Sequence, residues 1–200
     1  MDDRHLVLYG LAIKKHASAA AVAALVGLSE DRVSELLAEA TAGGRSVEAQ
    51  GAYLLSPAGR MIVDGQCAKF YAEMRLDRGF IQANERFERI NTELKQLITD
   101  WQLMEVGGQK VRNDHADAEY DAHMLSRLGD LHDRFTPIIQ ALSCAVPRLR
   151  HYLGKLEQAL ERAEAGDGRW VSDAKLESYH TVWFEMHEDL LRIRDGVREE

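Results

Sequence analysis

Several residues near the middle of the chain have side chains that bind ligands or metals. The segment of residues 113–121 (NDHADAEYD) supplies Asn113, Asp114, His115 and Asp121. One interpretation is a pocket rim or a set of metal ligands, because imidazole and carboxylate groups coordinate divalent ions. The other is a helix N-cap, since Asn and Asp side chains accept hydrogen bonds from the first backbone N–H groups of a helix. Both interpretations stay open, and the cap explains Asp114 and Asp117 most simply.

A second group of candidate residues lies near the C-terminus. It comprises Tyr179, His180, Trp183, Phe184 and His187. The last four are spaced i, i+3, i+4 and i+7, which places them on one face of a helix. Two of them are aromatic, so we expect this face to be buried. A buried histidine needs a hydrogen-bond partner, and Asp121 or Asp117 could provide it. A metal site is the alternative, although no compact pair of histidines favours it.

A third candidate is Lys95, which lies one turn after Asn91 on a predicted long helix that also carries Trp101. The lysine lies beside the apolar stripe of that helix. Its side chain could run along apolar surface toward water, or it could offer a cation to an anionic ligand between helices. The sequence leaves both open, and Lys95 and Trp101 are retained as candidate pocket residues.

The sequence shows no arrangement of residues that would catalyse a reaction by itself. It contains no Gly-x-Ser-x-Gly and no Walker loop, and neither cysteine has a context that would activate it. The pair Gly107-Gly108 predicts a tight hairpin turn rather than a phosphate cradle, because no helix start follows it directly. We therefore expect no catalytic residue, no cofactor and no metal site.

Long helices must position these candidates. Apolar residues at a spacing of 3.5–3.6 predict an antiparallel helical bundle over residues 67–200. Its predicted helices cover residues 80–104, 117–146 with Pro137 inside, 147–165, and a last one that Ser172 or Asp173 caps and that ends near Arg198. The segment 166–168 (GDG) predicts a loop.

Residues 1–66 show the pattern of a winged helix-turn-helix domain with a small β-hairpin. Helices are predicted over residues 4–16, over 19–26 after a Ser18 cap, and after Ser29, and a further helix starts at Pro57. Two strands, 46–49 and 52–55, flank Gln50-Gly51 and predict the hairpin. If this domain bound DNA, the third helix and the hairpin would contact it through Ser29, Arg32, Ser34 and Arg45.

The charges disfavour that DNA-binding interpretation. Residues 1–66 carry six basic and eight acidic side chains, a balance of −2, and the whole chain has a net charge of −8. The predicted third helix has four carboxylates against the single cation of Arg32. Such a helix would be repelled by DNA phosphates, which carry about one charge per 1.7 Å of duplex. Protein docking is the expectation that remains for this domain, with DNA as an alternative.

Composition sets the class of protein. The chain has 200 residues, of which 46% are hydrophobic and 29% charged, with 3 proline and 2 cysteine residues. These values predict a mainly α-helical globular fold without a disulfide framework. No long apolar run and no signal-peptide pattern occurs, so we expect a cytoplasmic protein that does not enter a membrane.

Three segments of the predicted bundle resemble a known family. They are residues 93–102 (ELKQLITDWQ), 113–121 (NDHADAEYD) and 178–190 (SYHTVWFEMHEDL), and the turn at 56–60 (SPAGR) fits as well. Together they are similar to the C-terminal accessory region of bacterial proteins like pyruvate phosphate dikinase and phosphoenolpyruvate synthase. The resemblance covers roughly residues 20–198 and implies a small winged helix followed by a helical domain.

The resemblance implies a role but no catalytic residue. Dikinase-like enzymes use an ATP-grasp domain and a phosphorylated histidine in a loop of the type Thr-x-Gly-Gly-x-x-Ser/Cys-His, and this chain contains neither. It is therefore expected to be a non-catalytic accessory or partner subunit of such a phosphotransferase, with a small molecule as a further ligand. The alternative is a ligand-responsive transcriptional regulator that binds DNA as a homodimer, as paired half-sites require.

Overall fold

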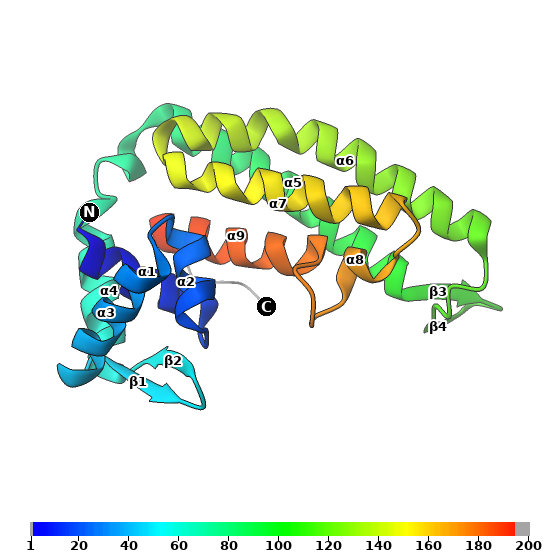
Figure 1. Ribbon diagram of the computed structural model, residues 1–200. Coiled ribbons are helices and arrows are strands. Elements are labelled where there is room, and N and C mark those ends of the chain that lie inside the picture. Colours follow the sequence, from blue (N-terminus) through cyan, green and yellow to red (C-terminus); the bar gives the residue numbers. More distant parts are fainter. Residues whose placement is uncertain (1, 195–200) are drawn as a thin grey trace. The chain divides into compact units, whose positions relative to one another are not determined.

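A computed structural model describes residues 2–194 of the chain (Figure 1). The fold is mainly helical, with two small antiparallel sheets. The described residues divide into two compact units, one of residues 2–77 and 187–194 and one of residues 78–186. These limits differ from the predicted ranges 1–66 and 67–200, and the contacts described below give the reason.

The first unit begins with helices and a hairpin, as the sequence predicts. Its elements are α1 (Asp3–Lys14), α2 (Ala19–Val26), α3 (Glu30–Ala42), β1 (Ser46–Ala49), β2 (Ala52–Leu55), α4 (Pro57–Phe70) and the 3-10 helix η1 (Met74–Leu76). The side chains of Ser18, Ser29 and Ser56 accept hydrogen bonds from the backbone N–H groups three residues later. The predicted caps Ser18 and Ser29 are thus confirmed, as is the helix start at Pro57, and Ser56 is a third cap. Each serine satisfies a donor that the helix leaves unpaired.

The hairpin is also confirmed, with the predicted bounds of both strands. Strands β1 and β2 pair antiparallel, with Ser46 opposite Leu55 and Ala49 opposite Ala52. The first turn of α4 packs directly on the backbone next to this hairpin. A Cβ atom on Gly59 would meet the carbonyl oxygen of Arg45 far inside contact distance. Glycine is therefore required where α4 approaches the chain that enters β1.

The end of α9 (Tyr179–Arg194) completes the first unit. The Tyr9 hydroxyl donates to Asp189 Oδ1 at 2.6 Å, and the Asp189 carboxylate is fully buried. Arg75 Nε donates to the carbonyl oxygen of Ile193 at 2.7 Å, and Arg192 pairs with Asp64 at 3.2 Å. The unit therefore extends past the predicted boundary to Asp77 and takes in residues from the other end of the chain.

The second unit consists of long helices and a second hairpin. Its elements are α5 (Arg78–Gln102), β3 (Leu103–Val106), β4 (Gln109–Arg112), α6 (Ala118–Ala145), the 3-10 helix η2 (Pro147–Leu149), α7 (Arg150–Glu164), α8 (Arg169–Ser172) and the first half of α9. Helices α5 and α6 lie side by side, and α7 packs on α6 (Figure 1). Phe87, Phe135 and Trp183 form an aromatic cluster in the core, with Phe135 and Trp183 centroids 4.5 Å apart.

The turn at Gly107-Gly108 is confirmed. Both glycines have positive φ, 60° and 79°, and they connect β3 to β4. A two-residue hairpin loop of this kind requires positive φ at both positions, which glycine adopts without strain. The helix predicted over residues 80–104 ends earlier, at Gln102, because the hairpin strand β3 begins at the next residue, Leu103.

The predicted start of the last helix is wrong. Neither Ser172 nor Asp173 caps it, because Ser172 ends the short helix α8 and Asp173 accepts from the backbone N–H of Lys175 in a turn. The helix begins at Tyr179, and the Ser178 hydroxyl accepts from the backbone N–H of Thr181. Its predicted end near Arg198 lies outside the described residues.

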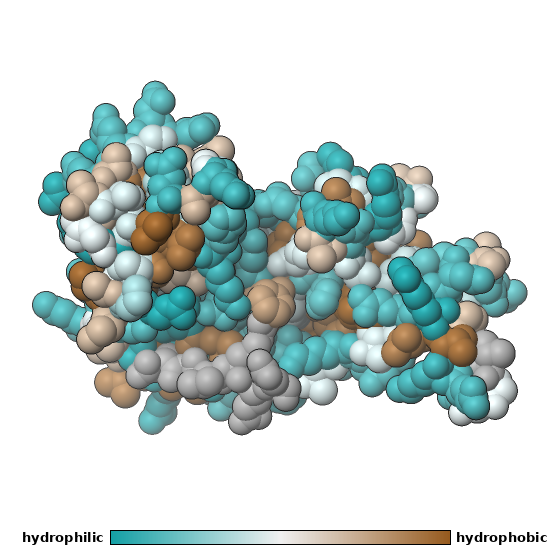
Figure 2. All heavy atoms as spheres, turned by 90° about the horizontal axis from the view of Figure 1, so that it is seen from below, coloured by the Kyte–Doolittle hydropathy of each residue, from teal (hydrophilic) through white to brown (hydrophobic). Residues whose placement is uncertain are grey.

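The surface of the second unit carries apolar side chains on its hairpin. Leu103 and Val111 are exposed there, and Figure 2 shows hydrophobic atoms at that end of the molecule among hydrophilic ones. Over residues 2–194, no helix is both long enough and apolar enough to cross a membrane.

Candidate functional site

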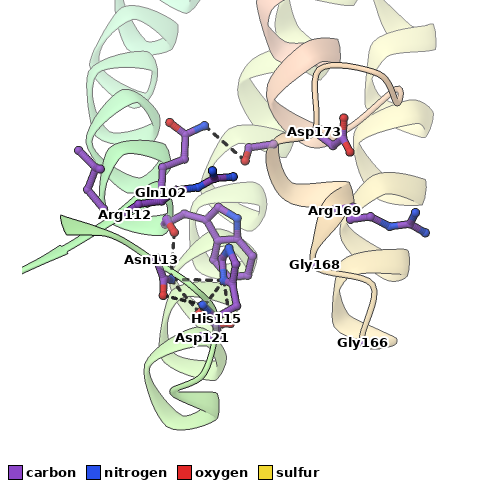
Figure 3. A pocket seen from close by; sticks show the side chains of 12 residues that line it. Gln102, Arg112, Asn113, His115, Asp121, Gly166, Gly168, Arg169 and Asp173 are labelled. Atoms are coloured by element: carbon purple, nitrogen blue, oxygen red, sulfur yellow. Dashed lines mark hydrogen bonds and ion pairs between the residues drawn. The ribbon is translucent and has the colours of Figure 1, made fainter.

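A pocket opens in the second unit where the end of α5 and the β3–β4 hairpin face the α7–α8 connection (Figure 3). Its volume is about 920 Å³, which falls within the range of small-molecule sites. The lining residues are Trp101, Gln102, Leu103, Arg112, Asn113, His115, Asp121, Gly166, Gly168, Arg169, Ser172 and Asp173.

Asn113 organises the wall of this pocket from a buried position, with 4% of its surface exposed. Its Nδ2 group donates to the Trp101 carbonyl oxygen and to Asp121 Oδ1, each at 3.1 Å. Its Oδ1 atom accepts from the backbone N–H of His115 at 3.0 Å. One amide side chain therefore connects the end of α5, the segment after the hairpin and the first turn of α6.

His115 is held in a strained conformation. Its φ is +59°, the left-handed region that non-glycine residues rarely adopt. Its Nδ1 atom lies 2.9 Å from Asp121 Oδ2, and its ring centroid lies 4.6 Å from that of Trp101. Because an ionised carboxylate only accepts hydrogen bonds, the proton belongs on Nδ1. The Nε2 atom is then left to accept a hydrogen bond.

The opposite wall comes from the loop between α7 and α8. Gly166 follows the end of α7 and has φ of +101°. Its backbone N–H donates to the carbonyl oxygen of Ala163 in the last turn of that helix. A Cβ atom on Gly168 would lie 3.1 Å from the Trp101 ring, so this glycine packs on the indole. Arg169 contacts Asp167 through two hydrogen bonds of 2.8 and 2.7 Å, and these lower the pKa of the Asp167 carboxyl.

The structure brings together four of the predicted site residues. Trp101, Asn113, His115 and Asp121 all line the pocket. Asp117 caps α6, since its side chain accepts from the backbone N–H groups of Glu119 and Tyr120. Asp114 is exposed and does not cap the helix, because its Oδ1 atom accepts from the backbone N–H of Ala116 in the turn before α6. Lys95 is exposed on α5 and is not among the lining residues.

The candidates on α9 lie elsewhere and do not line the pocket. The Tyr179 hydroxyl is 3.2 Å from His132 Nδ1, and burial raises the pKa of Tyr179. Trp183 Nε1 donates to Asn91 Oδ1 at 3.0 Å. His187 is buried and belongs to the first unit. These residues are parts of two cores rather than of one site.

The expectation that one buried face carries His180, Trp183, Phe184 and His187 holds for only two of them. Trp183 and His187 are buried, whereas Phe184 is 42% exposed and His180 is half-buried. Val182, Met186 and Leu190 are buried beside them, so the buried face of α9 is displaced toward these residues. Asp121 does not support His180 either, because its oxygen atoms contact Asn113 and His115.

His132 is a buried histidine that the sequence did not single out. Burial lowers its pKa from the ordinary value of 6.5, and the nearby carboxylates of Glu157, Asp133 and Glu164 oppose this effect. Its ring meets Tyr179 edge-on at 5.9 Å between centroids. The pair is a buried core contact in which the imidazole and the phenol share a hydrogen bond of 3.2 Å. In the described part of the chain, no three His, Cys, Asp or Glu side chains are arranged to hold a metal ion.

Sequence reasoning missed residues of both pocket walls. It did not select Gln102, Leu103 and Arg112 on the hairpin side, or any lining residue of the opposite wall, namely Gly166, Gly168, Arg169, Ser172 and Asp173. Arg112 directly precedes the polar segment that begins at Asn113, and this adjacency could have pointed to it. The residues after Gly166 carry no such signal, because only the fold brings them to Trp101.

Two of the four candidate DNA-contacting residues, Ser29 and Arg32, make side-chain contacts within the first unit. The Ser29 side chain caps the helix. Arg32 pairs with Glu35 at 3.2 Å and with Asp3 at 3.3 Å, and these hydrogen bonds, the one to Glu35 first, raise the pKa of its guanidinium. Ser34 and Arg45 are half-buried. The single cation of α3 is thus neutralised by neighbouring carboxylates.

Comparisons with protein-family models, with curated proteins and with solved structures give no match to this chain. The resemblance to the dikinase-like accessory region therefore depends on the three sequence segments alone.

Proposed function

We propose that this chain is a non-catalytic accessory or partner subunit of a phosphotransferase similar to pyruvate phosphate dikinase. In this proposal the first unit is a winged helix that docks another protein. The second unit is an antiparallel helical bundle whose pocket binds a small ligand or a group of the partner.

One observation carries the proposal. The pocket is lined by residues from two separate segments that resemble the dikinase-like accessory region: Trp101 from residues 93–102, and Asn113, His115 and Asp121 from residues 113–121. These segments are joined by the hairpin and meet through the hydrogen bond from Asn113 to the Trp101 carbonyl oxygen. The resemblance and the pocket thus coincide in space.

The charges of α3 support docking of protein over DNA. The helix carries Glu30, Asp31, Glu35 and Glu39, and Arg32 is paired within the unit. DNA binding gains most of its affinity by neutralising phosphates with lysine and arginine. An acidic helix loses that gain and is suited to a basic protein surface.

The alternative is a ligand-responsive winged-helix regulator that binds DNA as a homodimer. The element order α1, α2, α3, β1, β2, α4 favours it, because this is the order of winged-helix domains. The two functions predict opposite effects of one substitution on α3. Adding a cation there should strengthen DNA binding, but it should weaken docking to a basic partner.

The experiment is a pull-down with the tagged full-length chain from native lysate at low salt. Bound proteins are identified by mass spectrometry, and bound nucleic acid is measured. It compares wild type with Glu35→Lys, which changes an exposed residue of α3. Glu85→Lys is the matched control, because it makes the same charge change on the exposed side of α5.

We expect stoichiometric recovery of an ATP-grasp or phosphohistidine protein with wild type and with Glu85→Lys, and its loss with Glu35→Lys. Recovery of DNA that increases with Glu35→Lys and falls steeply with salt would instead establish the regulator. A partner enzyme that neither binds this chain nor changes its rate with it would refute the proposed role.

A further inference from the structure

The charged groups around the pocket are unequally matched. The Asp121 carboxylate accepts hydrogen bonds from Asn113 and His115. Arg169 is bound by Asp167 through two contacts. Arg112 lines the same pocket, yet among residues 2–194 no carboxylate lies within salt-bridge distance of it. Its positive charge is therefore unmatched on the pocket wall.

The placement of Arg112 makes this charge available to a ligand. It is the last residue of β4, opposite Leu103, at the point where the hairpin returns to the end of α5. Figure 3 shows its side chain directed into the pocket from the hairpin side. His115 lines the same side of the pocket, and its Nδ1 atom is occupied by Asp121, which leaves Nε2.

Asp173 lies on the opposite wall, where α8 ends (Figure 3). Its Oδ1 atom accepts from the backbone N–H of Lys175, and its charge interacts with that of Arg169 on the same wall. Arg112 on the hairpin side and Asp173 on the opposite wall have charges of opposite sign. A ligand that fits the pocket would place its negative group beside Arg112 and hydrogen-bond donors toward Asp173.

We propose that this pocket binds a small ligand carrying an oxyanion, a carboxylate or phosphate-type group, with Arg112 as its main cationic contact. A guanidinium presents two parallel N–H groups that match the two oxygen atoms of such a group. Partial enclosure by the pocket walls strengthens this attraction over that at an open surface. The inference deepens the proposed function by naming the ligand class of its pocket.

The probe for this test is sulfate, because it keeps two negative charges throughout the working pH range and isolates the oxyanion chemistry. The ¹⁵N-labelled full chain is titrated with sodium sulfate to about 30 mM, which covers millimolar dissociation constants. Sodium chloride holds the ionic strength near about 0.15 M, so that general screening stays constant. The Trp101 indole N–H and the Arg112 Nε–H report binding.

Wild type should show saturable shifts of these two signals. Arg112→Gln should weaken sulfate binding at least about tenfold, as loss of a charge-assisted pair predicts, while Arg112→Lys should keep part of it. Asp173→Asn should bind sulfate as well as wild type or more tightly, because it removes a negative charge from the pocket. Arg150→Gln, which changes an exposed arginine at the start of α7, should bind as wild type does.

Absence of saturable shifts in wild type would overturn the proposal, and so would Arg112→Gln that binds sulfate as wild type does. Equal weakening by Arg150→Gln would show a general ionic effect and would overturn it as well. Arg112→Lys keeps the test valid if Arg112→Gln fails to fold. Since sulfate binding is measured without a partner, its failure is separate from failure of the pull-down.

Discussion

Replacement of Asn113 by alanine should destabilise the second unit by about 3.5 kcal/mol, because two neutral hydrogen bonds contribute about 1 kcal/mol each and a charge-assisted one about 1.5–3 kcal/mol. The neutral bonds join Asn113 to the Trp101 carbonyl oxygen and to the His115 N–H, and the charge-assisted bond joins it to Asp121. The lower end of the sum applies, since the Asp121 side chain is 18% exposed and can bind water instead.

The assay is urea unfolding followed by tryptophan fluorescence. All three tryptophans of the chain, Trp101, Trp170 and Trp183, belong to residues 78–186, so the signal follows the second unit alone. The His115 amide should also lose protection from hydrogen exchange in Asn113→Ala. The matched control is Asp114→Ala, which removes one exposed side-chain acceptor next to it and should cost no more than about 1 kcal/mol.

A loss of less than about 1 kcal/mol for Asn113→Ala, or one equal to that of the control, would refute this account of the pocket wall. The double variant with Asp121→Asn measures the shared bond directly. Coupled residues should lose less together than the sum of their separate losses. Additive losses would mean that Asn113 and Asp121 do not stabilise each other.

Three further predictions test the cores around the site. Gly59→Ala should lower stability by more than about 3 kcal/mol, because its Cβ would clash with the Arg45 backbone, and urea unfolding followed by the backbone circular dichroism checks this. Trp183→Phe should lower stability by about 1–3 kcal/mol, since Asn91 Oδ1 is left buried without its donor. Urea unfolding followed by the fluorescence of Trp101 and Trp170 measures this loss. An unfolding midpoint equal to that of wild type would show that the hydrogen bond contributes nothing. The pKa of His132 is lowered by burial from 6.5, so stability should be complete above that pH and fall as the pH drops toward the folded-state value; replacement by glutamine should flatten the pH dependence of unfolding, and an unchanged slope would show that another group causes it.

Local backbone chemistry made much of the first unit predictable. Ser18, Ser29 and Ser56 each precede a helix and satisfy one of its unpaired N–H groups, and such caps depend only on neighbouring residues. The hairpin at Gln50-Gly51 is equally local, because both residues adopt the positive φ that its turn requires. These signals act within a few residues, so a sequence displays them directly.

Competition between equivalent signals explains the misplaced start of α9. Ser172, Asp173 and Ser178 are all good capping residues, and sequence reasoning chose among the first two. In the structure Asp173 stabilises a turn and Ser178 stabilises the first turn of α9. Burial of Val182 and Met186 favours the later start, and which cap is used therefore depends on packing rather than on local propensity.

The far wall of the pocket could not be predicted for a related reason. Gly168 follows a loop that the sequence does indicate, but its contact with the Trp101 ring joins residues far apart in the chain. Nothing in the composition of that loop shows which aromatic ring it will meet. The near wall was accessible because Asn113, His115 and Asp121 lie within one short polar segment.

The conformation of His115 indicates that the pocket is formed before any ligand arrives. A residue other than glycine in the left-handed region costs on the order of 1 kcal/mol, and three contacts oppose that cost: the Asn113 acceptor on its N–H, the Asp121 carboxylate on Nδ1 and the Trp101 ring. With both its backbone and its ring fixed, the imidazole loses little freedom on binding. Preorganisation of this kind lowers the entropic cost of association, so His115, although its side chain is 43% exposed, should add little to the cost of binding a ligand in this pocket.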